Sequence, residues 1–515
     1  MKYKYIIWFS AMMVGLGLSS CKENLLEEIT ELNLDRALSP TELTAQVVDR
    51  TNVRLNWRRV SNADSYVIEI FDNAEFSGTA TRSIEGVKFE ELPYTVEGLF
   101  GETIYGVRVG AVGEGLGNST WITTTFETGI EHIFNELDPE TLTEESVTLS
   151  WPEGELVTSV VLMPGEIEHR VSSADAEAGT TTIVGLESDV TYTATLMNED
   201  KRRGVMVFTT LLGGPGVTKV TTSDNLAAVI AAAADGAVFA IEPGTYVIND
   251  KIEINKNISV RGYKPHKKPV IQGAIFRVTK NAALTLRDLS LDGTGGGSDQ
   301  TVVYNEDLDS PYGAFLMQNC EVKKYVKGIF YVNKKARIPS VTFTNNLIHD
   351  IECNEGDFID FRKGIADEFI FVDNTVYNSA AARDLFRMDA GGSDNFGSVE
   401  SKITISSNTF YKAVSNNGKR YLYIRLANHS ISFTKNLIVE SEGYYTNQGA
   451  TTITELSGNN YHNAPNFTAS TQSNAQNDSG NYTSLNPEFT DPENGDFTVN
   501  NLDLKLNGIG AARWR

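Results

Sequence analysis

The stretch from Gln318 to His462 repeats one short pattern six times: QNCEV (318–322), NNLIH (345–349), DNTVY (373–377), SNTFY (407–411), KNLIV (435–439) and GNNYH (458–462). Its asparagines, Asn319, Asn346, Asn374, Asn408, Asn436 and Asn459, are 27, 28, 34, 28 and 23 residues apart. A strand-forming repeat of this length is typical of a parallel β-helix. Asn suits the tight turn of each coil, because it tolerates a left-handed backbone and its amide can bond to the Asn of the next coil. Scattered Asn turns in an ordinary β-rich protein explain the regular period less well.

The first 21 residues, MKYKYIIWFSAMMVGLGLSSC, contain two early lysines and an apolar run too short to span a bilayer. We therefore predict a signal peptide over 1–20. The ending LSSC resembles the lipobox of bacterial lipoproteins, which implies lipidation of Cys21 and a tether over 21–39. The acidic residues after Cys21 resemble an export signal of glycan-foraging Gram-negative bacteria. The resemblance implies a lipid anchor in the outer membrane, facing the cell exterior. A plain signal peptide with an incidental Cys is the alternative.

Two segments before the repeat alternate apolar and polar residues between turns, which predicts β-sandwiches. Each contains a Trp suited to a core, Trp57 and Trp151. Each also contains a segment, LFGETIY (99–105) or LESDVTY (186–192), that resembles the tyrosine corner of fibronectin type III domains. The predicted fold is all-β, with two fibronectin type III-like sandwiches followed by a right-handed parallel β-helix. The predicted domains are 40–129, 130–212 and 216–515.

The β-helix contains further stretches that resemble known families. NISVRGY (257–263) and LTLRDLSLDGT (284–294), after an Ala-rich helix suited to capping the first coil, resemble the start of chondroitinase B and the alginate lyases of polysaccharide lyase family 6. They also resemble domain-of-unknown-function family 4957, and the ending from Asn486 resembles family 5123. The resemblance implies a chondroitinase-B-like part over 216–330 and a C-terminal part over 331–515.

A second strand follows each Asn pattern, and its alternation predicts which side chains face outward. These strands are IFYVN (329–333), FIDFRK (358–363), LFRMD (385–389) and YLYIRL (421–426). A one-residue slip would bury the charged side chains, which excludes that register. The predicted inward residues are Phe330, Val332, Ile359, Phe361, Phe386, Met388, Leu422 and Ile424. The predicted outward columns are Tyr331, Asp360, Arg387, Tyr423 and Asn333, Arg362, Asp389, Arg425.

An outer face of this kind suits an acidic polysaccharide. Arg binds carboxylate or sulfate bidentately, and tyrosines pack against sugar rings. We predict that Tyr331, Asp360, Arg362, Asp389, Tyr423 and Arg425 bind a pectin-like or glycosaminoglycan-like polymer during glycan utilisation. In the alternative interpretation the charges satisfy one another, with Asp360 pairing Arg387 and Asp389 pairing Arg362 or Arg425. An adhesion or scaffold protein is a further alternative. Other glycan-uptake proteins are candidate partners.

The lyase resemblance implies a specific chemistry for two segments, GDFIDFRKG (356–364) and RDLFRMDAGG (383–392). It places Lys363 as the base of a β-elimination and Arg387 as the assisting acid. Asp357, Asp360 and Glu355 would then bind Ca²⁺, which stabilises the enediolate. The chain departs from the family, however. The longer acidic motif before the Lys is absent, Gly364 replaces a small polar residue, and no His follows Arg387. These departures favour binding over catalysis.

The formal net charge of −23 lies mostly in the N-terminal part. Residues 1–215 contain 15 Lys and Arg against 34 Asp and Glu, whereas residues 216–515 contain 29 against 33. A binding face on the β-helix is therefore free to be locally basic. No long basic run indicates a nucleic-acid partner. Cys320 and Cys353 are too few for a disulfide framework, and we expect both to be buried thiols.

Overall fold

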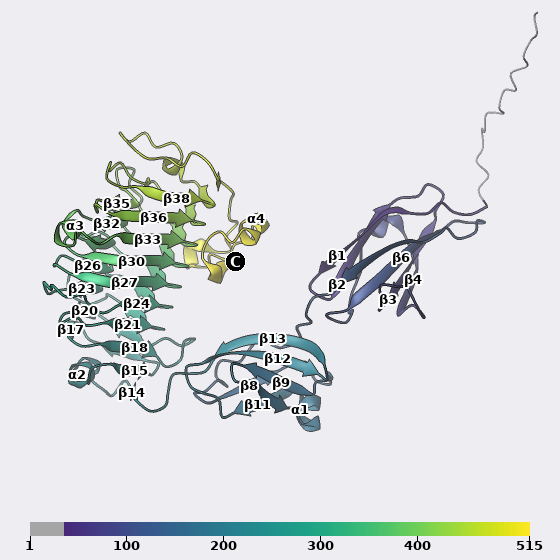
Figure 1. Cartoon of the computed structure of the whole chain (residues 1–515), viewed down its shortest axis with the longest axis horizontal. Coiled ribbons are helices and arrows are strands. Elements are labelled where there is room, and N and C mark those ends of the chain that lie inside the picture. The colour runs from purple at the N-terminus through teal and green to yellow at the C-terminus, as the bar shows by residue number, and fades with distance from the viewer. Residues whose placement is uncertain (1–34) are drawn as a thin grey trace, which may run out of the picture. The chain divides into compact units, whose positions relative to one another are not determined.

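The computed structural model describes residues 35–515, so the predicted signal peptide and Cys21 lie outside the described residues. The described chain is almost entirely β-structure and forms two sandwiches and a β-helix (Figure 1). None of the described helices is long and apolar enough to cross a membrane.

The first sandwich has the sheet orders β1-β2-β5 and β4-β3-β6-β7, which pair antiparallel. Trp57 is buried in its core, and the Tyr105 hydroxyl accepts a hydrogen bond from the Phe100 amide at 2.8 Å. The predicted tyrosine corner is therefore present. Its strands are β1 (Thr41–Val48), β2 (Asn52–Arg58), β3 (Ser65–Phe71), β4 (Arg82–Val87), β5 (Tyr94–Val96), β6 (Ile104–Val112) and β7 (Ile122–Glu127), with a 3-10 turn η1 (Phe89–Glu91).

The second sandwich is shorter, with sheet orders β11-β8 and β10-β9-β12-β13. Trp151 is buried, and the Tyr192 hydroxyl accepts from the Glu187 amide at 3.0 Å, so this tyrosine corner is present as well. Its elements are β8 (Ser146–Ser150), β9 (Ser159–Met163), β10 (Ile167–Arg170), α1 (Ser173–Ala178), β11 (Thr180–Val184), β12 (Thr191–Asn198) and β13 (Lys201–Thr209).

Three parallel sheets form the walls of the β-helix, and each coil from β15 to β35 contributes one strand to each sheet. The first sheet contains β14 (Val217–Val220), β15 (Ala237–Ile241), β18 (Ile258–Gly262), β21 (Leu284–Arg287), β24 (Phe315–Gln318), β27 (Arg337–Thr344), β30 (Ile365–Val372), β33 (Ser401–Ser406), β36 (His429–Thr434) and β38 (Ile453–Ser457). The second contains β16 (Thr245–Val247), β19 (Val270–Gln272), β22 (Ser290–Asp292), β25 (Glu321–Lys323), β28 (Leu347–His349), β31 (Thr375–Tyr377), β34 (Thr409–Tyr411), β37 (Leu437–Val439), β39 (Asn459–His462) and β40 (Tyr482–Thr483).

The third sheet contains β17 (Lys251–Ile254), β20 (Ile275–Val278), β23 (Val302–Tyr304), β26 (Phe330–Val332), β29 (Ile359–Phe361), β32 (Phe386–Met388) and β35 (Leu422–Ile424). The eight residues predicted to face inward are all 0–1% exposed, because alternation turns them into the coil. The predicted Ala-rich helix is α2 (Leu226–Ala232), which buries Leu226 and Ile230 in the core of the β-helix.

An asparagine ladder stabilises one corner of the coils. Asn346, Asn374, Asn408, Asn436 and Asn459 are fully buried, and the Nδ2 of each of the first four donates to the Oδ1 of the next at 2.8–3.3 Å. The prediction was wrong by one residue at Asn319. In that coil the ladder position is occupied by Cys320, whose backbone N–H donates to Asn346 at 2.9 Å.

Asn319 instead belongs to a neighbouring column, one residue earlier in each coil. This column adopts the left-handed backbone, with φ of 50° at Asn319, 56° at Asn345 and 57° at Asp373. The left-handed turn and the amide ladder are thus supplied by consecutive residues. Both Cys320 and Cys353 are free and buried, as expected.

The C-terminal segment folds back over the second sheet. A separate apolar cluster joins Phe497, Val499 and Leu504 to Tyr411 and Leu437 of the coils. This segment contains a short helix α4 (Leu502–Leu506) and the 3-10 turns η3 (Pro492–Asn494) and η4 (Ala512–Trp514), and another turn, η2 (Pro465–Phe467), precedes it. In Figure 1 α4 and the third-sheet strands lie on opposite sides of the β-helix, so the third sheet stays uncovered by this segment.

Candidate functional site

Three consecutive coils place the same kind of sequence on the third sheet: DFIDFR (357–362), DLFRMD (384–389) and RYLYIR (420–425). In each, the second, third and fifth residues are buried in the core, whereas the first, fourth and sixth face away from it. The strand register aligns Tyr331 with Asp360, Asp360 with Arg387, and Arg387 with Tyr423, which confirms the first predicted column. We call the nine aligned polar positions the polar grid: Asp357, Asp360, Arg362, Asp384, Arg387, Asp389, Arg420, Tyr423 and Arg425.

Five residues of the polar grid form a closed ion-pair network. Arg362 donates to Asp357 at 3.0 Å and to Asp360 at 2.9 Å, and lies 3.6 Å from Asp389. Arg387 binds Asp389 bidentately, with both contacts at 3.1 Å, and also donates to Asp357 at 3.4 Å. With three carboxylates and two guanidinium groups, the network has a formal charge of −1.

Tyr423 lies between two guanidinium groups in the polar grid. The guanidinium carbons of Arg387 and Arg420 are 4.5 and 4.6 Å from the centre of its ring, within the range of cation–π contact. Arg420 also binds Asp384 bidentately at 3.0 Å, and the Arg425 guanidinium donates to the Tyr423 hydroxyl at 3.5 Å. The Tyr423 ring therefore already contacts two guanidinium groups, whereas Tyr331 makes no cation–π contact among the described residues.

Asp360 differs from its predicted exposure. Its side chain leaves the core as expected, yet it is only 2% exposed, and that of Asp357 is 3% exposed, because arginine side chains lie against them. Burial raises the pKa of both carboxyls, and Arg362 opposes the rise at Asp360. Burial alone would lower the pKa of Arg362 and Arg387, but their carboxylate partners outweigh it and raise both values.

Two cationic side chains lack a carboxylate partner at the edge of the polar grid where the strands of the third sheet end. Lys363 and Arg425 are exposed, and neither takes part in any ion pair of residues 35–515. Lys363 follows Arg362 directly, where β29 ends. The short helix α3 (Gly391–Asn395) borders this edge, and its Asn395 amide donates to the Lys363 carbonyl at 2.8 Å. Lys363 and Arg425 are thus the cations most available to an external anion.

The predicted calcium ligands are not gathered into a metal site. Glu355 is exposed, whereas Asp357 and Asp360 are buried and bound to arginines. Across the described part of the chain no group of three or more His, Cys, Asp or Glu side chains is arranged to hold a metal ion. The carboxylates as placed do not fit Ca²⁺, and a calcium requirement stays a prediction.

The sequence interpretation missed Asp384 and Arg420. Both lie two residues before a strand of the third sheet, the position that Asp357 occupies in the first of the three coils. The available signal was the repeated charge at the first position of the three hexapeptides. The backbone N–H groups of Asp384 and Arg420 donate to Asp357 and Asp384, respectively, which continues the ladder from coil to coil.

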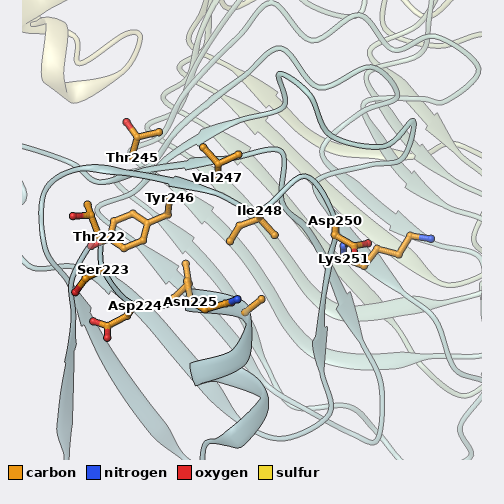
Figure 2. Close-up of a pocket in the computed structure, with 12 residues that line it drawn as sticks. Thr222, Ser223, Asp224, Asn225, Thr245, Tyr246, Val247, Ile248, Asp250 and Lys251 are labelled. Carbon is orange, nitrogen blue, oxygen red and sulfur yellow. The ribbon is translucent and has the colours of Figure 1, made fainter.

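A cavity of about 460 Å³ lies elsewhere, at the N-terminal end of the β-helix (Figure 2). The residues before and within the start of α2 line one side of it, and Thr245–Lys251 line the other. No residue of the polar grid contributes to it.

Two segments of the β-helix match families described only as domains of unknown function. Residues 244–379 match DUF4957, and residues 403–514 match DUF5123. The middle hexapeptide of the polar grid, 384–389, lies between the two matched segments. No curated protein matches the chain.

Two similar solved structures correspond to the two kinds of domain. A two-domain fibronectin type III segment of chicken tenascin is 21% identical, covering 33% of this chain and 97% of that one, with a TM-score of 0.24. A mutant of the PL6-family alginate lyase AlyGC is 13% identical, with a TM-score of 0.36. That match covers 64% of this chain but only 47% of the lyase chain. The described chain combines two antiparallel β-sandwiches, each with a tyrosine corner, and a parallel β-helix in which two segments match the DUF4957 and DUF5123 families.

Proposed function

We propose that the protein binds an acidic polysaccharide along the third sheet, from Tyr331 to Arg425. The observation that carries the proposal is the pair of exposed cations without carboxylate partners, Lys363 and Arg425, at one edge of the polar grid. Ion pairing elsewhere in the grid fixes the side chains around them, so the rotamer entropy lost on binding is mainly that of Lys363 and Arg425 themselves. Tyr331 offers a ring against which a sugar can pack.

The ion pairs within the polar grid limit what its arginines can contribute to ligand binding. Arg362 and Arg387 already have carboxylate partners, so a ligand anion must compete with Asp357, Asp360 or Asp389 for them. Lys363 and Arg425 have no such competitor. We therefore assign the main contacts with anionic groups to these two residues, and a positioning role to the paired arginines.

Affinity electrophoresis in gels that contain polygalacturonate, alginate, chondroitin sulfate or heparin tests the proposal. We expect Lys363→Ala and Arg425→Ala each to weaken binding about tenfold, as for the loss of a charged contact. Lys402→Ala is the matched control, because Lys402 is an exposed lysine on β33 of the first sheet. If the gels retard Lys363→Ala, Arg425→Ala and Lys402→Ala equally, the polysaccharide does not bind along the third sheet.

β-Elimination is a second candidate function, favoured by the absence of an ion-pair partner for Lys363. In that reaction Lys363 takes the proton from the carbon next to the uronate carboxylate. The electron pair then forms a carbon–carbon double bond, and the glycosidic oxygen leaves with a proton. The raised pKa of Arg387 disfavours it as the proton donor, so we rank binding above catalysis.

The two candidate functions are separated by the ultraviolet absorbance of the unsaturated product. Each polymer is incubated with the protein, once with Ca²⁺ and once with a chelator. A binder gives no absorbance increase in either condition. An increase that requires Ca²⁺ and is lost in Lys363→Ala would replace binding by lyase activity.

We also propose that Cys21 anchors the protein in the outer membrane, with the sandwiches as spacers. Support comes from the LSSC sequence and the acidic residues after it. Metabolic labelling with a fatty acid should mark the wild-type protein and not Cys21→Ser. Digestion by protease added to intact cells tests exposure on the outer face.

A further inference from the structure

Lys363 and Arg425 are separated by a fixed distance along the β-helix axis. Lys363 lies at the end of β29 and Arg425 at the end of β35, with the coil of β32 between them. The Arg425 backbone N–H donates to Met388 at 2.7 Å and that of Asp389 to Phe361 at 2.8 Å, so Arg425 and Asp389 are in register with Arg362. Lys363 lies one residue beyond this row, in the same coil as Arg362. Parallel strands are about 4.8 Å apart, which places the two cations about 10 Å apart along the axis.

Asp389 occupies the middle position of this edge. Its side chain is 19% exposed, whereas those of Asp357 and Asp360 are 3% and 2% exposed. The network to which it belongs has one more carboxylate than guanidinium groups. A ligand that follows the edge therefore meets a cation, then a carboxylate, then a cation.

We propose that the polysaccharide has its anionic groups on alternate sugars and not on every sugar. This inference rests on the proposed function. A pyranose ring with its linking oxygen is about as long as the spacing between coils, so two sugars advance about as far as Lys363 lies from Arg425. Acidic sugars then bind the two cations, and a neutral sugar lies over Asp389. A polymer with a carboxylate on every sugar places one of them against Asp389, where like charges repel.

Two pairs of probes test the spacing of charge. Hyaluronan and unsulfated chondroitin octasaccharides carry a carboxylate on alternate sugars, whereas octasaccharides of polygalacturonate and polymannuronate carry one on every sugar. Non-specific electrostatic attraction favours the second pair, because its charge is higher. We expect the opposite order by calorimetry on the full chain, with the alternating octasaccharides binding at least about tenfold more tightly.

Asp389→Asn provides a second measurement. Removal of this charge should strengthen binding of the fully charged octasaccharides several-fold. The ratio of the affinity for the alternating octasaccharides to that for the fully charged ones should therefore decrease. Asp367→Asn is the matched control. Asp367 forms a similar bidentate pair with Arg337, at 2.8 and 2.9 Å, on the first sheet. The control should leave the ratio unchanged. If Asp389→Asn fails to fold, the ratio for the wild-type protein still decides the question.

The possible failures can be distinguished. If polygalacturonate binds as tightly as the alternating octasaccharides, and Lys363→Ala and Arg425→Ala weaken both, the charge-spacing inference falls and the proposed function stands. If neither variant affects any probe, both the proposed function and the inference are overturned.

Discussion

At the scale of single residues, each ladder asparagine joins three coils. The Asn408 Oδ1 accepts from the Asn374 backbone N–H at 2.9 Å, while its Nδ2 donates to the Phe371 carbonyl at 2.8 Å and to Asn436 at 2.9 Å. The side chain is fully buried, so water cannot replace any of these bonds. Loss of the amide leaves several buried groups without partners.

Asn408→Ala should therefore lower the free energy of unfolding by about 3 kcal/mol or more, since each buried unsatisfied group costs about 1–3 kcal/mol. Urea denaturation followed by fluorescence measures the change. Asn354→Ala, at an exposed position, should stay within about 0.5 kcal/mol. Similar stabilities of the two variants would show that the ladder contributes little.

The raised pKa of Asp357 gives a pH prediction with a definite sign. A carboxyl whose pKa is higher in the folded state stabilises the fold fully below its unfolded value, about 3.9, and this contribution is lost as pH rises through the folded value. Relative to Asp357→Asn, the wild-type protein should lose stability as the pH rises above about 4. Urea unfolding between pH 3 and 7 tests this.

Asp292 provides the opposite case. Burial raises its pKa, but hydrogen bonds from Thr294 outweigh burial and the net shift is downward. Its contribution is present above about pH 3.9 and is lost as the pH falls through the lower folded value. The wild-type protein should therefore lose stability relative to Asp292→Asn on acidification. If the free energy of unfolding changes equally with pH in Asp357→Asn and Asp292→Asn, the directions given for both pKa shifts are wrong.

The sequence predicted the residue roles at the Asn corner only in part. The period identifies the corner, but Asn319 and Asn346 look alike in sequence although one adopts the left-handed turn and the other the buried ladder. Likewise the columns of charge were predictable, whereas the pairing of Asp360 with Arg362 of its own coil was not. That choice depends on side-chain rotamers, which a pattern of alternation does not determine.

At the scale of elements, the facing of the third sheet was predictable because side chains on a strand alternate with a period of two and a one-residue slip would bury the charged side chains. The column of the polar grid that consists of Asp357, Asp384 and Arg420 was harder to predict from the sequence. The loops between successive third-sheet strands differ in length, so the sequence signal for this column is only the charge three residues before each of Asp360, Arg387 and Tyr423. Helix α3 was not predicted either, because its sequence GGSDN has no helical pattern.

Helix α3 depends on close backbone contact with the preceding coil. A Cβ atom on Gly392 would lie 2.5 Å from the Gly364 carbonyl oxygen and 2.9 Å from Leu426. Gly392→Ala should therefore destabilise the β-helix by about 1–3 kcal/mol and weaken glycan binding by displacing the edge near Lys363. Gly397→Ala, with its nearest contact at 3.4 Å, is the control. Thermal unfolding and affinity electrophoresis report the two effects, and unchanged binding would separate α3 from the site.

At the scale of the whole molecule, the C-terminal segment joins coils that are far apart in sequence. Arg513 donates to Asn345 at 3.0 Å and to Asn319 at 3.3 Å, and the Trp514 indole donates to Thr375 at 2.7 Å. These contacts span 139 to 194 residues. Their long range explains why the sequence predicted the β-helix but not the segment that covers its second sheet.

Trp514→Ala should loosen the coils beneath the segment. The ring packs against Phe497 at 5.8 Å, and its loss costs about 2–3 kcal/mol for a half-buried aromatic side chain. Hydrogen exchange should accelerate at β31 and β34 and remain unchanged at β17 and β20. Leu502→Ala, at a residue that is 65% exposed, is the control. Uniform acceleration over all coils would mean that the β-helix opens as one unit.

A solenoid can in general fold coil by coil as it leaves the ribosome, since each coil needs only its neighbour. Here the coils from Asn319 to Leu437 are contacted by Phe497, Arg513 and Trp514, which are synthesised after all of these coils. The second wall of the middle coils is therefore covered only after this segment has left the ribosome.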